Sequence, residues 1–108
     1  MARKTTPDAL LDILARHVGK RNSVSGNELA ALVGVKPRTV RALVLKLREN
    51  AVAVCGTPET GYYIAENAAE VEDTCKLLES HALHQLTVAA RMRKTTLPDL
   101  LGQLHLST

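Results

Sequence analysis

The stretch ELAALVGVKPRTVRALVLKL, residues 28–47, decides the fold of this chain. Gly34 suits a tight turn with a positive φ between two helices, and Ala30 is small enough to let those helices cross closely. Pro37 stands where the second helix would begin. Apolar residues recur on one face before and after the turn, namely Leu29, Val33, Val35, Val40, Leu43, Val44 and Leu47. The stretch therefore predicts a helix-turn-helix, and an unrelated pair of helices joined by a glycine turn is the alternative.

The segment before this stretch predicts one more helix. Residues 6–8, Thr-Pro-Asp, are typical of a helix start with proline at the first helical position. Apolar spacing extends that helix over residues 7–18, and a glycine follows it. Residues 23–24 are expected to add a short strand. Ser25, with Glu28 three residues later, forms a capping box that starts the first helix of the pair.

The segment after this stretch predicts one antiparallel hairpin over residues 51–65. Asn50 suits a left-handed exit from the preceding helix, which we expect over residues 37–49. The alternating residues that follow have the period of a strand, and residues 57–61, TPETG, have the chemistry of a turn. The expected fold is therefore mainly α with a small β-hairpin.

A long helix over residues 67–94 is expected after the hairpin. Asn67, with Glu70 three residues later, starts it. Its first turns are acidic and its last turn is basic, as the helix dipole favours. Residues 95–98, TTLP, are expected to end it. A short leucine-rich helix then follows, with an apolar face of Leu100, Leu101, Leu104 and Leu106.

One apolar stripe runs along the long helix at spacings of three and four residues. The stripe consists of Val71, Cys75, Leu78, Ala82, Leu86 and Ala89. It is longer than a domain of this size covers, so we expect it to form a homodimer interface. The alternatives are a helix that folds back on its own domain and a leucine-rich end that holds a protein partner. These segments predict two domains, residues 1–65 and residues 66–108.

Composition excludes several classes of function. Only Tyr62 and Tyr63 are aromatic among 108 residues, so base stacking on single-stranded nucleic acid is disfavoured. Two cysteines are too few for a disulfide scaffold, and His81 and His84 lack the further ligands that a metal site needs. No apolar run reaches the ~20 residues that span a bilayer, and the N-terminus does not resemble a signal peptide. We expect a cytoplasmic protein of a bacterial or phage-infected cell with no cofactor, no metal, no membrane association and no enzymatic activity.

Charge is distributed unevenly along the chain. Residues 1–50 hold ten basic and four acidic residues, a net charge of +6, whereas residues 51–108 have a net charge of −3. A basic half next to an acidic half suggests that the first half meets a polyanion such as nucleic acid. Chance clustering of charge on solvated helix faces is the alternative.

The chain also resembles a known group of proteins. The sequence SGNELAALVGVKPRTVRALVLKLREN (residues 25–50), followed by GYYI (residues 61–64), is similar to the small N-terminal winged helix of biotin-operon repressors and related bacterial regulators. The continuation through residue 94 resembles short phage and prophage winged-helix proteins with one long helix after the wing. The resemblance implies a winged helix-turn-helix plus a long C-terminal helix. The chain has no room for the catalytic domain of the biotin repressors, so we expect neither effector binding nor ligase activity.

In helix-turn-helix docking, the start of the second helix meets base edges in the major groove. Arg38 is the expected base-reading residue because its planar fork can bind guanine O6 and N7 together. Thr39 and Ala42 are expected to touch bases as well. The residues expected to contact phosphates are Lys36, Arg41 and Lys46. Further positive charge is expected from Lys20, Arg21, Arg3 and Lys4, because the wing tip carries Glu59 and no lysine or arginine.

The sequence thus predicts a sequence-specific double-stranded DNA-binding protein, a small homodimeric transcriptional regulator of phage or prophage type. The alternative is a protein-interaction or replication-accessory module that uses the winged helix as a scaffold. The acidic wing tip favours this alternative.

Overall fold

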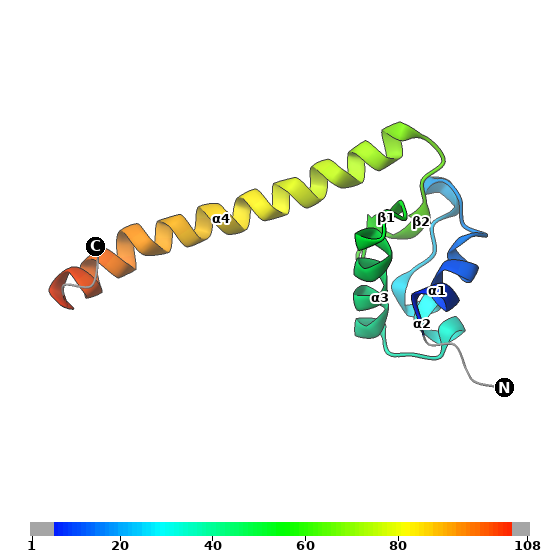
Figure 1. Ribbon diagram of the computed structural model, residues 1–108, viewed down its shortest axis with the longest axis horizontal. Helices are drawn as coiled ribbons and strands as arrows, with labels where there is room; N and C mark the ends of the chain where they lie inside the picture. The colour runs from blue at the N-terminus through cyan, green and yellow to red at the C-terminus, as the bar shows by residue number, and fades with distance from the viewer. Residues whose placement is uncertain (1–5, 105–108) are drawn as a thin grey trace. The chain divides into compact units, whose positions relative to one another are not determined.

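The computed structural model describes residues 6–104, and the side chains of residues 6–94. The protein is mainly helical, with one two-stranded antiparallel sheet and a long C-terminal helix (Figure 1), which confirms the predicted fold class. The elements are α1 (Pro7–Leu14), the 3₁₀ helix η1 (Lys20–Asn22), α2 (Gly26–Val33), α3 (Pro37–Glu49), β1 (Val54–Thr57), β2 (Gly61–Ile64) and α4 (Ala68–Leu104). The chain divides into two compact units, Met1–Thr74 and Cys75–Thr108, so the first turns of α4 belong to the first unit. The predicted basic arm, Arg3 and Lys4, and the predicted apolar position Leu106 lie outside the described residues.

Helix α1 ends at Leu14, four residues before the predicted end. The chain leaves it through tighter turns, in which amides donate to carbonyls three residues back. This early exit lets Val18 pair with Ile64 of β2, and the Gly19 amide donates to the Ile64 carbonyl at 2.8 Å. Pairing with a strand far along the chain therefore overrides the helical periodicity of this segment.

The helix-turn-helix forms from α2 and α3 as predicted. The Ser25 hydroxyl caps α2 by accepting a hydrogen bond from the Glu28 amide at 3.0 Å. Gly34 ends α2 in the left-handed conformation, with φ 85° and ψ 37°. The Ala30 carbonyl accepts hydrogen bonds from the amides of Gly34 and Val35, and Ala30 itself is buried. The small residue and the glycine thus occupy the positions that the spacing assigns to them.

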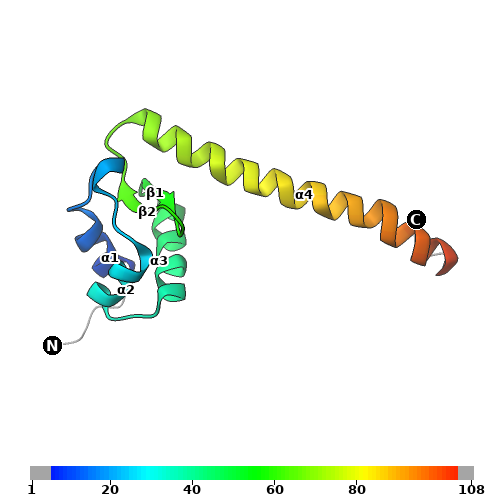
Figure 2. The ribbon, with the colours of Figure 1, turned by 180° about the vertical axis from the view of Figure 1, so that it is seen from behind.

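Helices α1, α2 and α3 pack against one another beside the hairpin (Figures 1 and 2). Their apolar faces form the core, whose fully buried members include Leu10, Leu14, Leu29, Val40 and Val44. Helix α3 has the predicted bounds. The left-handed residue after it is Ala51, with φ 65°, and not Asn50, with φ −96°, so that prediction is wrong by one position.

The hairpin is shorter than the predicted range, with its strands at residues 54–57 and 61–64. Gly56 lies so close to the opposite strand, with φ 95°, that a Cβ there would meet the Gly61 carbonyl oxygen at 1.9 Å. On the other side of β2, Val24 and Tyr62 exchange backbone hydrogen bonds of 2.9 and 2.8 Å. The short strand predicted at residues 23–24 is therefore present as a single bridge.

Helix α4 begins where the sequence predicts, with the Asn67 side chain accepting a hydrogen bond from the Glu70 amide at 2.9 Å. Its first turns pack on the hairpin. Thr74 is buried there, and its hydroxyl accepts a hydrogen bond from the Gly56 amide at 3.2 Å. The helix then continues without interruption to Leu104. The predicted break at residues 95–98 is wrong. A proline inside a helix removes one backbone hydrogen bond, and in this protein the helix continues past that missing bond. The separate leucine-rich helix that we predicted is therefore the last part of α4.

Candidate nucleic-acid interface

Helix α3 presents a cationic face to solvent. The valines and leucines spaced along its inner side are buried or half-buried, which turns the intervening positions outward. The exposed residues of this face are Lys36, Arg38, Arg41, Ala42, Leu45 and Lys46. Among the residues that the structure describes, neither Arg38 nor Arg41 has a hydrogen-bond or ion-pair partner. Both guanidinium groups are therefore available to a ligand.

Two of the predicted contact residues on or near this face, Thr39 and Lys46, have different surroundings. Thr39 is half-buried, so less of its side chain reaches solvent than the sequence suggests. The Lys46 ammonium lies 4.0 Å from the Glu49 carboxylate, and both side chains are more than half exposed. Such a pair is weak and leaves the lysine able to exchange its partner for a phosphate.

Arg48 has a role that the sequence analysis missed. It lies on the flank of α3 that faces the hairpin, where its guanidinium donates to the Val54 carbonyl at 2.8 Å and to the Gly56 carbonyl at 3.0 Å. These two bonds hold β1 against the helix that carries Arg38. The signal was present in the spacing, because Arg48 comes one turn after the buried Val44 and so belongs to the inner side of α3.

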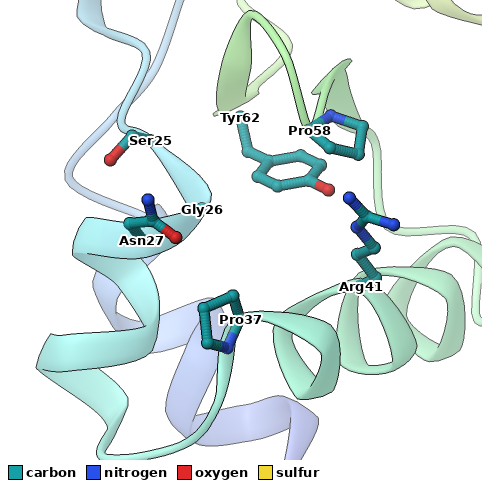
Figure 3. A pocket seen from close by; sticks show the side chains of 7 residues that line it. All are labelled: Ser25, Gly26, Asn27, Pro37, Arg41, Pro58 and Tyr62. Carbon is teal, nitrogen blue, oxygen red and sulfur yellow. The ribbon is translucent and has the colours of Figure 1, made fainter.

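A pocket of about 110 Å³ lies where α2, α3 and the hairpin meet (Figure 3). It is lined by Ser25, Gly26, Asn27, Pro37, Arg41, Pro58 and Tyr62. The positive end of the α2 dipole opens on one side of it. On the other side, the Tyr62 ring extends across the pocket with its hydroxyl directed toward the Arg41 guanidinium (Figure 3). The lining thus combines a helix N-terminus, a hydroxyl, a side-chain amide and a guanidinium, which are the donor groups that bind anions.

The hydroxyl of Tyr62 is held in its protonated form. Burial raises its pKa above the usual 10.0, and the charges of Arg48 and Arg41 oppose that change. Glu59 at the hairpin tip raises the same pKa further, because its negative charge disfavours a phenolate. At neutral pH the hydroxyl is therefore a hydrogen-bond donor. The sequence predicts only that Tyr62 lies in a strand, because no local pattern shows that this strand packs next to α3.

The hairpin tip is closed by its own side chains. The Thr57 amide donates to the Thr60 hydroxyl at 3.1 Å, and the Thr60 amide donates to the Thr57 hydroxyl at 3.0 Å. Pro58 and Glu59 are exposed between them. The tip therefore brings one negative charge, and no positive charge, toward the pocket.

Lys20 and Arg21 lie elsewhere. In η1, the Lys20 amide donates to the Glu70 carboxylate at 3.0 Å, and the Arg21 guanidinium lies 3.6 Å from the Glu66 carboxylate. This group surrounds the start of α4, at the opposite end of the first unit from the beginning of α3 (Figure 1). Backbone hydrogen bonds from Glu66 and Lys20 lower the pKa of Glu70 below its ordinary value of 4.5. The structure does not bring these two cations together with the face of α3.

The predicted apolar stripe of α4 is largely exposed. Val71 and Ala89 are half-buried, and the exposed members are Cys75, Leu78, Ala82 and Leu86. Met92 extends the stripe by one turn and is 59% exposed. The exposed Leu78 and Leu86 of this stripe are a feature typical of an interface.

Within the part of the chain that the structure describes, no helix is long and apolar enough to cross a bilayer. No group of three or more histidines, cysteines, aspartates or glutamates in that part could hold a metal ion, and His81 and His84 are both exposed. In comparisons with known proteins, no family model, no curated protein and no solved structure matches this chain.

Proposed function

We propose that this protein binds double-stranded DNA as a winged helix-turn-helix regulator that self-associates through α4. The observation that carries the proposal is the cationic face of α3, whose exposed Arg38 and Arg41 lack partners among the described residues. That face borders a pocket rich in anion-binding groups. A protein that recognises a DNA sequence needs cations for the bases and groups that bind phosphate. Base contacts specify the sequence, and phosphate contacts hold the protein in register.

The two arginines have different roles in this proposal. Arg38, at the second position of α3, enters the major groove and binds a guanine through O6 and N7. Arg41 lines the pocket beside Tyr62 and holds a phosphate oxygen together with the N-terminus of α2. Lys36 and Lys46 contact neighbouring phosphates. The exposed Leu45 lies on the same face and is suited to a thymine methyl group.

Fluorescence anisotropy with labelled random-sequence duplexes tests the proposal. Three phosphate contacts per protomer predict that log K falls with log[salt] with a slope of about −3 per protomer. R41A reduces that slope by about 1, and R38A relaxes base preference at one position of a selected site, at a loss of about 1–3 kcal/mol against the preferred base. R16A is the matched control, since Arg16 is an exposed cation outside α3. Absence of duplex binding at low salt would refute the proposal.

A protein-interaction or replication-accessory module is the second candidate. It is favoured by Glu59, which brings negative charge to the tip of the hairpin beside the pocket. The same anisotropy experiment separates the two, because a scaffold that recruits proteins through α4 needs no salt-dependent affinity for duplex DNA.

A further inference from the structure

We propose that two copies of α4 pair in antiparallel orientation, with residue 75 of one helix opposite residue 92 of the other. The inference rests on the self-association part of the proposed function and is independent of DNA binding. The occupant of the exposed stripe is a second copy of this chain. The spacing of exposed residues along α4 and the distribution of charge beside them favour this occupant.

From Cys75 onward, a seam that takes Gln85 in place of Leu86 and ends at Met92 follows the exposed stripe closely. The positions of this seam alternate by three and four residues, the repeat that keeps one face of a helix against a partner. The seam positions are Cys75, Leu78, Ala82, Gln85, Ala89 and Met92. All of them are exposed except the half-buried Ala89. Leu78 and Met92 are 44% and 59% exposed, so large apolar side chains lie near both ends of the seam.

Charge beside the seam determines the orientation. Residues 72, 79, 86 and 93 are spaced by seven and occupy one position of the heptad, on one flank of the seam, and they read Glu, Glu, Leu and Arg. In an antiparallel pair this flank faces the same flank of the other helix in reverse order. Glu72 then lies opposite Arg93 of the partner subunit, and Glu79 lies opposite Leu86 of the partner subunit. By two-fold symmetry, the Glu–Arg pair occurs twice.

A parallel pair lacks this complementarity. It brings the acidic first turns of both helices together, with Glu70, Glu72 and Asp73 of each copy at the same end, and it gathers the basic residues of both copies at the other end. Like charges gathered at the same end of a helix pair repel one another. The antiparallel pair also opposes the two helix dipoles. The acidic first turns and the basic last turn that stabilise one isolated helix thus also favour an antiparallel partner helix.

The size and composition of the seam predict a moderate affinity. Residues 72–93 span about 32 Å of helix. Ala82 and Ala89 allow close approach of the two axes but bury little apolar area, and Gln85 is a polar residue within the seam. Leu77 and Leu83 lie off the seam, so they do not add to it. We expect a reversible dimer in the micromolar range.

A disulfide experiment on the full chain reports the orientation. Cys75 is exposed, and Cys55 is buried in the hairpin. In the antiparallel pair the two Cys75 side chains lie about 25 Å apart along the axis, so the wild-type dimer forms no Cys75–Cys75 disulfide. M92C introduces a thiol opposite Cys75 of the partner subunit. Mild oxidation of M92C gives a covalent dimer, and peptide mapping places the link between positions 75 and 92.

Charge exchange tests the register independently. E72R and R93E each weaken dimerisation by about tenfold, because both symmetry-related Glu72–Arg93 attractions become repulsions. The double variant E72R/R93E restores dimerisation, because it exchanges the two charges and makes both pairs attractive again. K76E, an exposed charge reversal off the seam, leaves it unchanged. Dimerisation is measured by sedimentation equilibrium, and circular dichroism confirms that each variant is folded.

The outcomes are distinguishable. A 75–92 link with rescue by the double variant supports the antiparallel pair. A wild-type Cys75–Cys75 disulfide, or charge reversals without effect, overturns the orientation while self-association stands. A wild-type protein that remains monomeric at ~100 μM, tenfold or more above the expected dissociation constant, overturns the orientation and the proposed self-association together, and leaves DNA binding to its own test.

Discussion

Replacing Arg48 by methionine should destabilise the protein without removing a DNA contact. Methionine keeps the aliphatic length of the side chain but loses the guanidinium that donates to Val54 and Gly56 at 2.8 and 3.0 Å. A hydrogen bond from a charged donor contributes about 1.5–3 kcal/mol. Arg48 is half-buried, so we apply the lower end of that range to each of the two bonds and expect R48M to lose about 3 kcal/mol of unfolding free energy. In a domain of this size that loss lowers Tm by roughly 10–20 °C.

The matched control is R38M, which makes the same chemical change on the exposed side of the same helix. Urea unfolding followed by circular dichroism should show R38M within about 0.5 kcal/mol of the wild type. Duplex binding, measured at a temperature where both variants are folded, should show the opposite ranking. R38M loses affinity, and R48M keeps the wild-type slope of log K against log[salt].

Two results would refute this reasoning. A loss below about 0.5 kcal/mol in R48M would mean that water replaces the guanidinium at both carbonyls, so Arg48 does not anchor the hairpin. A salt slope reduced by about 1 in R48M would mean that Arg48 contacts a phosphate in the complex and leaves the hairpin to do so.

Three further perturbations have defined outcomes. G56A should lose more than about 3 kcal/mol and express poorly, because its Cβ would lie 1.9 Å from the Gly61 carbonyl oxygen at a strained φ; a Tm within a few degrees of wild type would contradict this. E59Q should tighten duplex binding several-fold at low salt, with the gain fading at high salt, since it removes the negative charge of the hairpin tip; unchanged affinity would show that the tip stays away from DNA. Because the folded state lowers the pKa of Glu70, its carboxylate contributes stability that is present above the ordinary value of 4.5 and is lost as pH falls through the lower, folded pKa. The urea midpoint of the wild type should therefore fall more steeply than that of E70Q as the pH is lowered below 4.5, and parallel curves would exclude this role.

Local chemistry made the helix-turn-helix predictable. Ser25 caps α2 through its own hydroxyl, Gly34 supplies the left-handed turn, and Pro37 begins α3, each by rules that act within a few residues. The buried faces followed from helical periodicity, because the valines and leucines of α3 recur at the spacing of one helix face. These features needed no knowledge of the rest of the chain.

Several of the errors and omissions arise where distant segments meet. Val18 leaves the helical pattern because Ile64 offers it a strand partner, and no local signal announces that pairing. The pocket formed by Arg41 and Tyr62 likewise depends on the return of β2 to α3. The prediction of Asn50 as the left-handed residue failed by one position, which is the usual precision of helix ends read from a sequence. Periodicity and capping rules therefore do not predict contacts between residues that are far apart in the sequence.

The small sheet has consequences for how copies of this chain can associate. The outer edge of β2 is paired with Val18 and Val24. On the outer edge of β1, the Arg48 guanidinium donates to the carbonyls of Val54 and Gly56. The Gly56 amide on the same edge donates to the Thr74 hydroxyl. Strands whose outer backbone groups are unsatisfied are templates for edge-to-edge aggregation. Here both margins are already closed by the chain itself, so the hairpin resists amyloid-type strand addition even though its strands are rich in apolar residues.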